Sequence, residues 1–307
     1  MMNAFSFIRY VPMWCLYLLA HFVSFIIRLR PHTGVMRVVH MNLQLAYPAL
    51  SERERHVLAN QAIRNQTLNM AESLKSWAMP PQWAIKQIHT VHNQEILTQA
   101  LANPNGMLAI VPHLGTWEMM NAWLNQFGSP TIMYKPVKGE KANQFVLQGR
   151  QRLNATLVPT DGSGVKAIFK TLKDGGFSII LPDHVPDLSG GVVVPFFGIP
   201  TLSSTLAPKL ASKTHCALVG LTCVRRDDRQ GFDIYCDKLD NPALYDKNIE
   251  ITTSALNDEI KTMINRFPNQ YMWGYKRFKH VPNYPNLYND TADFNNLVAH
   301  LKRPQIP

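Results

Sequence analysis

A histidine and a glutamate five positions apart are the side chains best suited to chemistry in this 307-residue chain. His113 is a potential general base, and Glu118 is a carboxylate that can orient it. They lie in the run VPHLGTWE, between an apolar stretch at 107–111 that predicts a strand and a stretch at 117–127 that predicts a helix. A titratable pair at a strand-to-helix junction is typical of α/β enzymes, whose loops carry the chemistry.

The spacing of the pair determines how the two side chains can meet. On one continuous helix, positions five residues apart point about 140° away from each other. His113 must therefore lie on an incoming turn that Gly115 permits, with Thr116 as the N-cap and Glu118 in the first helical turn. Glu118 then accepts a hydrogen bond from one imidazole nitrogen, and the other nitrogen is free to take a proton from a hydroxyl. The alternative interpretation is structural, because an acidic residue in a first turn also complements the helix dipole.

Several well-known catalytic motifs are absent from the sequence. It contains no G-x-S-x-G element for a serine nucleophile, no G-x-x-x-x-G-K-[ST] phosphate loop and no G-x-G-x-x-G dinucleotide fingerprint. These absences favour direct attack by a substrate hydroxyl on an activated acyl group. They argue against a covalent acyl-enzyme, a kinase and a dehydrogenase.

The elements that must position the pair are those of an α/β fold, with a mainly parallel mixed sheet flanked by helices. Residues 35–102 are predicted to be mostly helical, with an S-x-x-E capping box at 51–54. Further along, we predict strands at 107–111, 131–134 and 177–181, helices at 116–127, 140–153, 164–173 and 249–266, and a hairpin of 216–225 with 232–239. No linker divides this part, so residues 35–307 form one predicted catalytic domain.

The first 34 residues are predicted to form a membrane anchor. Residues 10–27 carry no formal charge, and 18 residues are about the minimum that can span a hydrocarbon core of about 30 Å. Arg28, Arg30 and Arg37 follow the apolar run and are expected to hold the downstream domain in the cytoplasm. A helix lying in the membrane interface and a buried core helix remain as alternatives.

The bulk composition narrows the partners and cofactors. A formal net charge of +10 suits acidic partners, and its even spread along the chain argues against nucleic acid. The four cysteines show no C-x-x-C spacing, so we expect no metal site. Cys223 and Cys236 are placed to face each other across the predicted hairpin, although reduced apolar thiols are the favoured interpretation.

Further sequence blocks acquire meaning when they are taken together with the H-x4-E motif and the apolar N-terminus. They are MYKP at 133–136, GRQRLN at 149–154, DGSGVKAIFKTLKDGG at 161–176, ILPDH at 180–184, VPFFG at 194–198 and YMWGYKRF at 271–278. In this order the chain resembles the bacterial lipid A biosynthesis acyltransferases (lauroyl/myristoyl transferases) of the lysophospholipid acyltransferase superfamily. The resemblance covers nearly the whole chain and is clearest over 107–278.

The resemblance implies a reaction and a location. His113 is the general base and Glu118 its partner in a dyad. An acyl chain passes from acyl carrier protein or coenzyme A to a hydroxyl of an anionic lipid A precursor, at the cytoplasmic face of the inner membrane. No metal or redox cofactor is implied. The alternatives are another lipid acceptor, such as a lysophospholipid, an ornithine lipid or a mannosylated glycolipid, and a non-catalytic membrane-binding protein.

Five further side chains lie in the blocks that resemble the family, and they are candidates for substrate binding. Lys135, Arg150 and Arg152 suit contacts with phosphate or carboxylate groups, although each fits a solvated helix face equally well. Asp183 and His184 lie at the end of a predicted strand, where site residues gather, and bracing of a loop is an equal alternative. The oxyanion donors are left open between backbone amides near Gly115 and a basic side chain.

Overall fold

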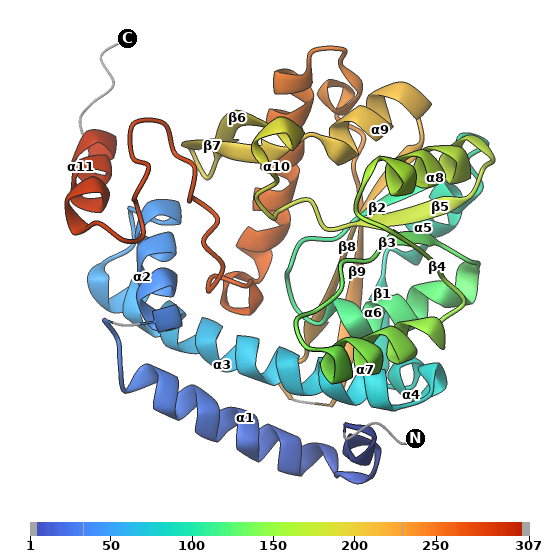
Figure 1. Ribbon diagram of the computed structural model, residues 1–307, viewed down its shortest axis with the longest axis horizontal. Coiled ribbons are helices and arrows are strands. Elements are labelled where there is room, and N and C mark those ends of the chain that lie inside the picture. The colour runs from blue at the N-terminus through green and yellow to red at the C-terminus, as the bar shows by residue number, and fades with distance from the viewer. Residues whose placement is uncertain (1–4, 33, 229, 303–307) are drawn as a thin grey trace.

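The computed structural model describes residues 5–32, 34–228 and 230–302, which build an α/β fold around one seven-stranded sheet (Figure 1). The strand order is β1-β9-β8-β2-β5-β3-β4, and every neighbouring pair is parallel except β8 with β9. The strands are β1 (Ile88–His92), β2 (Met107–Ile110), β3 (Thr131–Met133), β4 (Thr156–Val158), β5 (Phe177–Ile180), β8 (Ala217–Arg225) and β9 (Phe232–Lys238). The predicted mainly parallel mixed sheet is confirmed.

Helices cover both faces of this sheet, as parallel strands require. They are α1 (Met13–Arg28), α2 (Gly34–Ala46), α3 (Glu52–Ala78), α4 (Pro81–Ile85), α5 (Gln94–Leu101), α6 (Trp117–Leu124), α7 (Glu140–Gln151), α8 (Gly162–Lys173), α9 (Leu206–Thr214), α10 (Ile249–Arg266) and α11 (Thr291–Lys302). On the central strand β2, Leu108 and Ile110 pack into the core beneath α8, α9 and α10, whereas Met107 and Ala109 pack into the core beneath α5 and α6. The period of two along the strand thus separates two cores.

The predicted elements agree with the structure where the local signal is strong. Helix α10 has the bounds that were predicted, and the capping box between Ser51 and Glu54 forms in full at the start of α3. The prediction that 35–102 is mostly helical overlooked β1, a five-residue strand of β-branched and histidine residues that pairs with β9 at the sheet edge. Such short edge strands depend on their partner for stability and give only a weak sequence signal.

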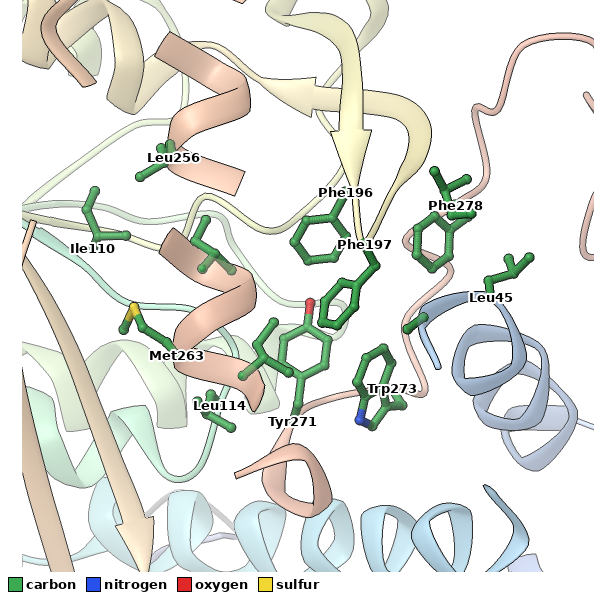
Figure 2. Packing of buried hydrophobic residues seen from close by; sticks show 14 of the residues in the cluster. Leu45, Ile110, Leu114, Phe196, Phe197, Leu256, Met263, Tyr271, Trp273 and Phe278 are labelled. Atoms are coloured by element: carbon green, nitrogen blue, oxygen red, sulfur yellow. The ribbon is translucent and has the colours of Figure 1, made fainter. Parts of the chain in front are cut away.

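A separate two-stranded hairpin, β6 (Gly191–Phe196) with β7 (Ile199–Ser204), carries the VPFFG block. Its two-residue turn places Phe197 at φ +52° and Gly198 at φ +79°, both in the left-handed region that a tight hairpin turn of this kind uses. Phe196 and Phe197 point into the core beside Tyr271 and Trp273 (Figure 2). The block therefore serves packing.

Helix α1 lies along α3 and leaves a broad apolar face uncovered (Figure 1). Trp14, Leu18, Leu19, Phe22, Val23, Phe25, Ile26 and Leu29 are all at least 41% exposed. With 16 residues, α1 is too short to be a membrane span, and none of the other helices in the described part of the chain is long and apolar enough. The membrane anchor at 1–34 therefore stays a prediction.

The four cysteines are free thiols. Cys223 and Cys236 lie on the antiparallel strands β8 and β9, but their partners across the ladder are Ile234 and Leu221. The two thiols are thus not opposite each other, and the predicted hairpin forms without a cross-strand cysteine pair.

Candidate active site

His113 lies on a tight segment that leaves β2 and enters α6. Gly115 adopts φ +64°, and a Cβ atom there would lie 1.9 Å from the carbonyl oxygen of Cys223. Only glycine fits, because the turn needs both the left-handed backbone and this close approach. The predicted turn at Gly115 is confirmed. Thr116 does precede α6, but its hydroxyl donates a 2.5 Å hydrogen bond to Glu72 and does not cap the helix.

The partner of His113 is Asp183. The imidazole Nδ1 lies 2.8 Å from Asp183 Oδ1, and the backbone N–H of His113 donates to Asp183 Oδ2 at 2.9 Å. Both side chains are buried, with 9% and 1% of their surface exposed. Burial opposes ionisation of Asp183, but the positive potential and the hydrogen bonds of His113 outweigh it and lower the pKa of this carboxyl. An ionised Asp183 fixes the proton on Nδ1 and leaves Nε2 as the acceptor.

The register of the sheet brings these two residues together. Strands β2 and β5 are adjacent and parallel, with Ile110 paired to Ile180, so His113 and Asp183 each lie three residues beyond a paired position. The two strands also end in matching sequences, IVPH and ILPD. Sequence reasoning noticed Asp183 as a strand-end residue but missed this parallel, which would have indicated the pair if β2 and β5 had been taken as neighbours.

The structure places Glu118 differently from the predicted dyad. Its Oε2 accepts a 2.8 Å hydrogen bond from the indole of Trp77, and its Oε1 is bound by the guanidinium of Arg150. Glu118 is 2% exposed, so this pairing satisfies a buried charge. The proposed hydrogen bond from His113 to Glu118 is thus replaced by one to Asp183, because the first turn of α6 directs Glu118 toward α3 and α7 instead.

His184 adds a second imidazole against the first. Its ring stacks on His113 with centroids 3.8 Å apart and an interplanar angle of 15°, and the ring of Tyr275 lies 4.3 Å from it. These rings cover the faces of the His184 imidazole and partly desolvate it, although the residue as a whole is exposed. This desolvation, reinforced by the nearby His113, lowers the pKa of His184 to about 4. His184 is therefore neutral at neutral pH.

The three predicted basic contacts have different surroundings. Lys135 is exposed, and its charge acts on His184. Arg150 binds Glu118 and lies over the ring of Tyr134 at 5.4 Å. Arg152 donates a 2.8 Å hydrogen bond to the backbone carbonyl of Trp77, near the end of α3. Of the three, Lys135 is the one whose charge affects His184.

A buried ion pair that the sequence did not reveal is hydrogen-bonded to Thr116, in the turn that follows His113. Glu72 on α3 is fully buried and receives a bidentate contact from Arg225 at the end of β8. The same carboxylate accepts hydrogen bonds from Thr116 and, at 3.1 Å, from Tyr17 on α1. One carboxylate thus joins α1, α3, β8 and the turn after His113. No local spacing signals it, because the three partners of Glu72 come from three distant segments.

The backbone amides of Gly115 and Thr116 are already engaged. Gly115 N–H donates to the carbonyl of Gln270 at 3.1 Å, and Thr116 N–H donates to that of Cys223 at 2.7 Å. Amides paired in this way do not supply an oxyanion hole without breaking the turn. These two amides are therefore unavailable to an oxyanion, and a basic side chain is the other option that the sequence left open.

Comparison with known proteins identifies the family of the chain. The family model for bacterial lipid A biosynthesis acyltransferase matches residues 2–280. The lipid A biosynthesis lauroyltransferase of Escherichia coli (strain K12) is 28% identical over 251 residues, which are 80% of this chain and 79% of that protein. The palmitoleoyltransferase of the same organism is 22% identical over 248 residues, with 80% and 79% covered. A phosphatidylinositol mannoside acyltransferase of Mycolicibacterium smegmatis is 30% identical over 183 residues, or 56% of each chain.

The sequence resemblance is thus confirmed by a match that covers most of the chain and includes His113, Asp183 and the turn between β2 and α6. The chain belongs to the bacterial lipid A biosynthesis acyltransferase family and is an acyltransferase that acts on a lipid acceptor.

Proposed function

We propose that this acyltransferase moves a fatty acyl chain from the thioester of acyl carrier protein or coenzyme A to a hydroxyl of a lipid A precursor. The observation that carries the mechanism is the 2.8 Å contact between His113 Nδ1 and Asp183 Oδ1. It gives a buried imidazole one fixed proton and one free basic nitrogen, which is what activation of a hydroxyl needs.

The reaction proceeds by direct transfer. His113 Nε2 takes the proton of the acceptor hydroxyl as its oxygen attacks the thioester carbonyl carbon, and a tetrahedral oxyanion forms. The intermediate collapses with cleavage of the C–S bond, and the proton on Nε2 passes to the departing sulfur. Asp183 remains ionised throughout and stabilises the imidazolium. We assign stabilisation of the oxyanion to a basic side chain, and Lys135 is our candidate because it is exposed beside His184.

Glu118 acts as a positioning residue in this proposal. Its carboxylate ties Trp77 of α3 and Arg150 of α7 to the first turn of α6, the helix that the catalytic segment enters. Since the carboxylate is buried, its loss would leave the charge of Arg150 without its partner. Substitution of Glu118 would then lower the rate of acyl transfer by displacing His113.

The acyl chain is assigned to a groove beside Tyr134. A cavity of about 490 Å³ lies between β4, α7 and the segment after β3, and its walls are mainly apolar side chains such as Leu147, Leu157 and Val158. It adjoins Tyr134, which precedes Lys135 and contacts Arg150. Its size is within the usual range for ligand pockets. Chain length would then depend on how far this groove extends.

We also propose that the enzyme works on the cytoplasmic face of the inner membrane, with the apolar face of α1 lying in the membrane interface. A row of exposed aromatic and aliphatic side chains on one side of a helix is the usual form of an interfacial anchor. Tyr17 on the opposite side of α1 binds Glu72 and keeps that face turned outward. No metal or redox cofactor is part of the proposal.

The direct test is acyl transfer by the purified enzyme in mixed micelles, with acyl carrier protein and coenzyme A thioesters offered separately. His113→Ala is expected to lose at least about 100-fold in kcat, the usual contribution of a general base. Mass spectrometry of lipid A from a deletion strain identifies the acceptor, because a missing acyl mass gives chain length and position together. Unchanged lipid A with altered mannosylated glycolipids would instead favour the second acceptor, which the similarity to a phosphatidylinositol mannoside acyltransferase supports.

A further inference from the structure

A basic cavity lies between α2 and the start of α3, apart from the residues around His113. Its volume is about 1120 Å³, and residues 31 and 32, which follow α1, close one side. Three arginines line it, Arg37, Arg53 and Arg55, and Glu52 is the one carboxylate among its lining residues. The three arginines outnumber the one carboxylate, so the walls carry a net positive charge even without a contribution from histidine. Neither the proposed reaction nor the proposed acyl groove uses this cavity.

The arginines differ in how much of each guanidinium is free for a ligand. Arg55 is held by backbone carbonyls of the α2–α3 connection, including that of Leu50, and serves as a wall. Arg37 donates one hydrogen bond, from Nη1 to the carbonyl of Tyr288 at 2.8 Å, and its other guanidinium nitrogens are left to contact a ligand. Arg53 is exposed and makes no hydrogen bond or ion pair with other described residues. Arg37 and Arg53 therefore offer planar donor groups of the geometry that phosphate oxygens accept.

Three histidines also line the cavity, His32, His40 and His56. The rings of His40 and His56 stack with centroids 5.5 Å apart and an interplanar angle of 19°. Burial, followed by the proximity of His56 and His32, lowers the pKa of His40, and Glu52 opposes this only in part. An anion in the cavity would oppose that effect, because it favours the charged form of His40.

The position of the cavity indicates where such an anion comes from. Leu29, at the end of the exposed apolar face of α1, is 61% exposed, and the cavity wall begins two residues later at Pro31. If α1 lies in a membrane interface, the mouth of the cavity is at the depth of the lipid headgroups. Basic pockets at that depth bind anionic headgroups.

We propose that this cavity binds the phosphate headgroup of an anionic phospholipid of the bilayer, at a site separate from the acyl-transfer site. The inference rests on the proposed membrane association of α1 but not on the proposed reaction. Arg37 and Arg53 contact the phosphate oxygens, and the stacked imidazoles of His40 and His56 supply further N–H donors. The bound lipid fixes the orientation of the enzyme on the membrane surface.

Vesicle co-sedimentation of the full-length protein tests the proposal without any acyl donor. Vesicles of phosphatidylcholine alone report on the apolar face of α1, and vesicles with added phosphatidylglycerol report on the headgroup site. The phosphatidylglycerol increment is the extra binding to vesicles that contain this lipid. In the double variant Arg53→Gln/His56→Gln this increment is expected to fall about tenfold, with binding to phosphatidylcholine unchanged. The matched control is Lys170→Gln/Lys173→Gln, which removes two positive charges from the exposed face of α8 and should change the increment by less than about twofold.

Three results would overturn the proposal. Equal loss in the variant and the control would mean that net charge alone attracts the membrane. The second result combines two measurements. If the variant kept the phosphatidylglycerol increment but abolished an imidazole NMR shift that glycerol 3-phosphate causes in the wild type, the cavity would be assigned to a soluble phosphate compound. A raised KM for acyl carrier protein with unchanged vesicle binding would make it a docking site for that acidic protein. The inactive His113→Ala variant should bind vesicles like the wild type, so a failure of the proposed reaction stays distinguishable.

The pH dependence supplies an independent readout. His40 is faced in the cavity by His32, His56, Glu52 and the three arginines, and its pKa lies below the ordinary value, so it gains charge only as the pH falls below its ordinary range. The phosphatidylglycerol increment is therefore expected to be larger at pH 5 than at pH 8. His40→Gln alone should flatten this dependence while keeping the arginine contribution. An increment that is the same at both pH values in the wild type would exclude His40 from the site.

Discussion

Replacing Asp183 by asparagine separates the two possible partners of His113. The wild-type carboxylate accepts from His113 Nδ1 at 2.8 Å and from the backbone N–H of His113 at 2.9 Å. Asparagine has nearly the same shape but only one acceptor oxygen. If that oxygen keeps the bond from the backbone N–H, the amide NH2 faces Nδ1 and forces the imidazole proton onto Nε2. The ring then has the wrong tautomer and no free basic nitrogen toward the substrate.

The expected magnitude follows from this tautomer argument. General-base catalysis contributes about 10²- to 10⁴-fold, so Asp183→Asn should lower kcat by a factor in that range. On the scale of about 1.36 kcal/mol per tenfold, this is about 2.7 to 5.4 kcal/mol of activation free energy. The pKa of Asp183 lies below its ordinary value of 3.8, so its carboxylate is present at every pH above that value. The deficit should therefore be the same at pH 6.5 and pH 8.5.

The assay is acyl transfer in mixed micelles at saturating acceptor and donor, with the product measured by mass spectrometry. Circular dichroism and the thermal midpoint verify that the variant is folded. Glu118→Gln is the matched comparison, because Gln also removes one buried carboxylate charge but alters the contacts with Trp77 and Arg150 and leaves the carboxylate partner of His113 in place. We expect it to lose less kcat than Asp183→Asn and more thermal stability.

The opposite pattern would refute the reasoning. If Asp183→Asn kept kcat within about threefold of the wild type while Glu118→Gln lost more than about 100-fold, Glu118 would be the partner of the base. The dyad expected from the H-x4-E spacing alone would then stand.

Four further perturbations have defined outcomes. Gly115→Ala should lower the free energy of unfolding by at least about 2 kcal/mol in denaturant titrations, because φ +64° is unfavourable for alanine and its Cβ would overlap the Cys223 carbonyl; a smaller loss would mean that the turn is adaptable. Between about pH 6.5 and about pH 4 the unfolded His184 binds a proton that the folded one does not, so stability should fall as the pH is lowered through this window, and His184→Gln should reduce the slope measured by thermal unfolding. Leu147→Trp should fill the groove beside Tyr134 and shift acyl-donor preference to shorter chains, whereas unchanged donor preference would place the chain elsewhere. Phe22→Ser on the exposed face of α1 should weaken binding to neutral vesicles without lowering thermal stability, and equal binding would remove α1 from the membrane contact.

Local sequence signals determined a large part of this protein. The apolar runs around β2, β3 and β5, the capping box of α3 and the bounds of α10 all depend on neighbouring residues, and the structure agrees with each. The same holds for the turn at Gly115, since residue spacing excluded one continuous helix and glycine permits a positive φ. The order of sequence blocks was sufficient to identify the family. Such signals are short in range, and a single sequence contains them in full.

Only the tertiary structure decided the partner of the catalytic histidine. Glu118 is close to His113 along the chain, but the first turn of α6 directs it toward Trp77 and Arg150. Asp183 is 70 residues away and reaches His113 because β2 and β5 are parallel neighbours in one register. Strand order depends on how helices pack over both faces of a sheet, and that sum of distant contacts is not encoded in any local spacing. The sequence therefore located the base, and the sheet selected its carboxylate.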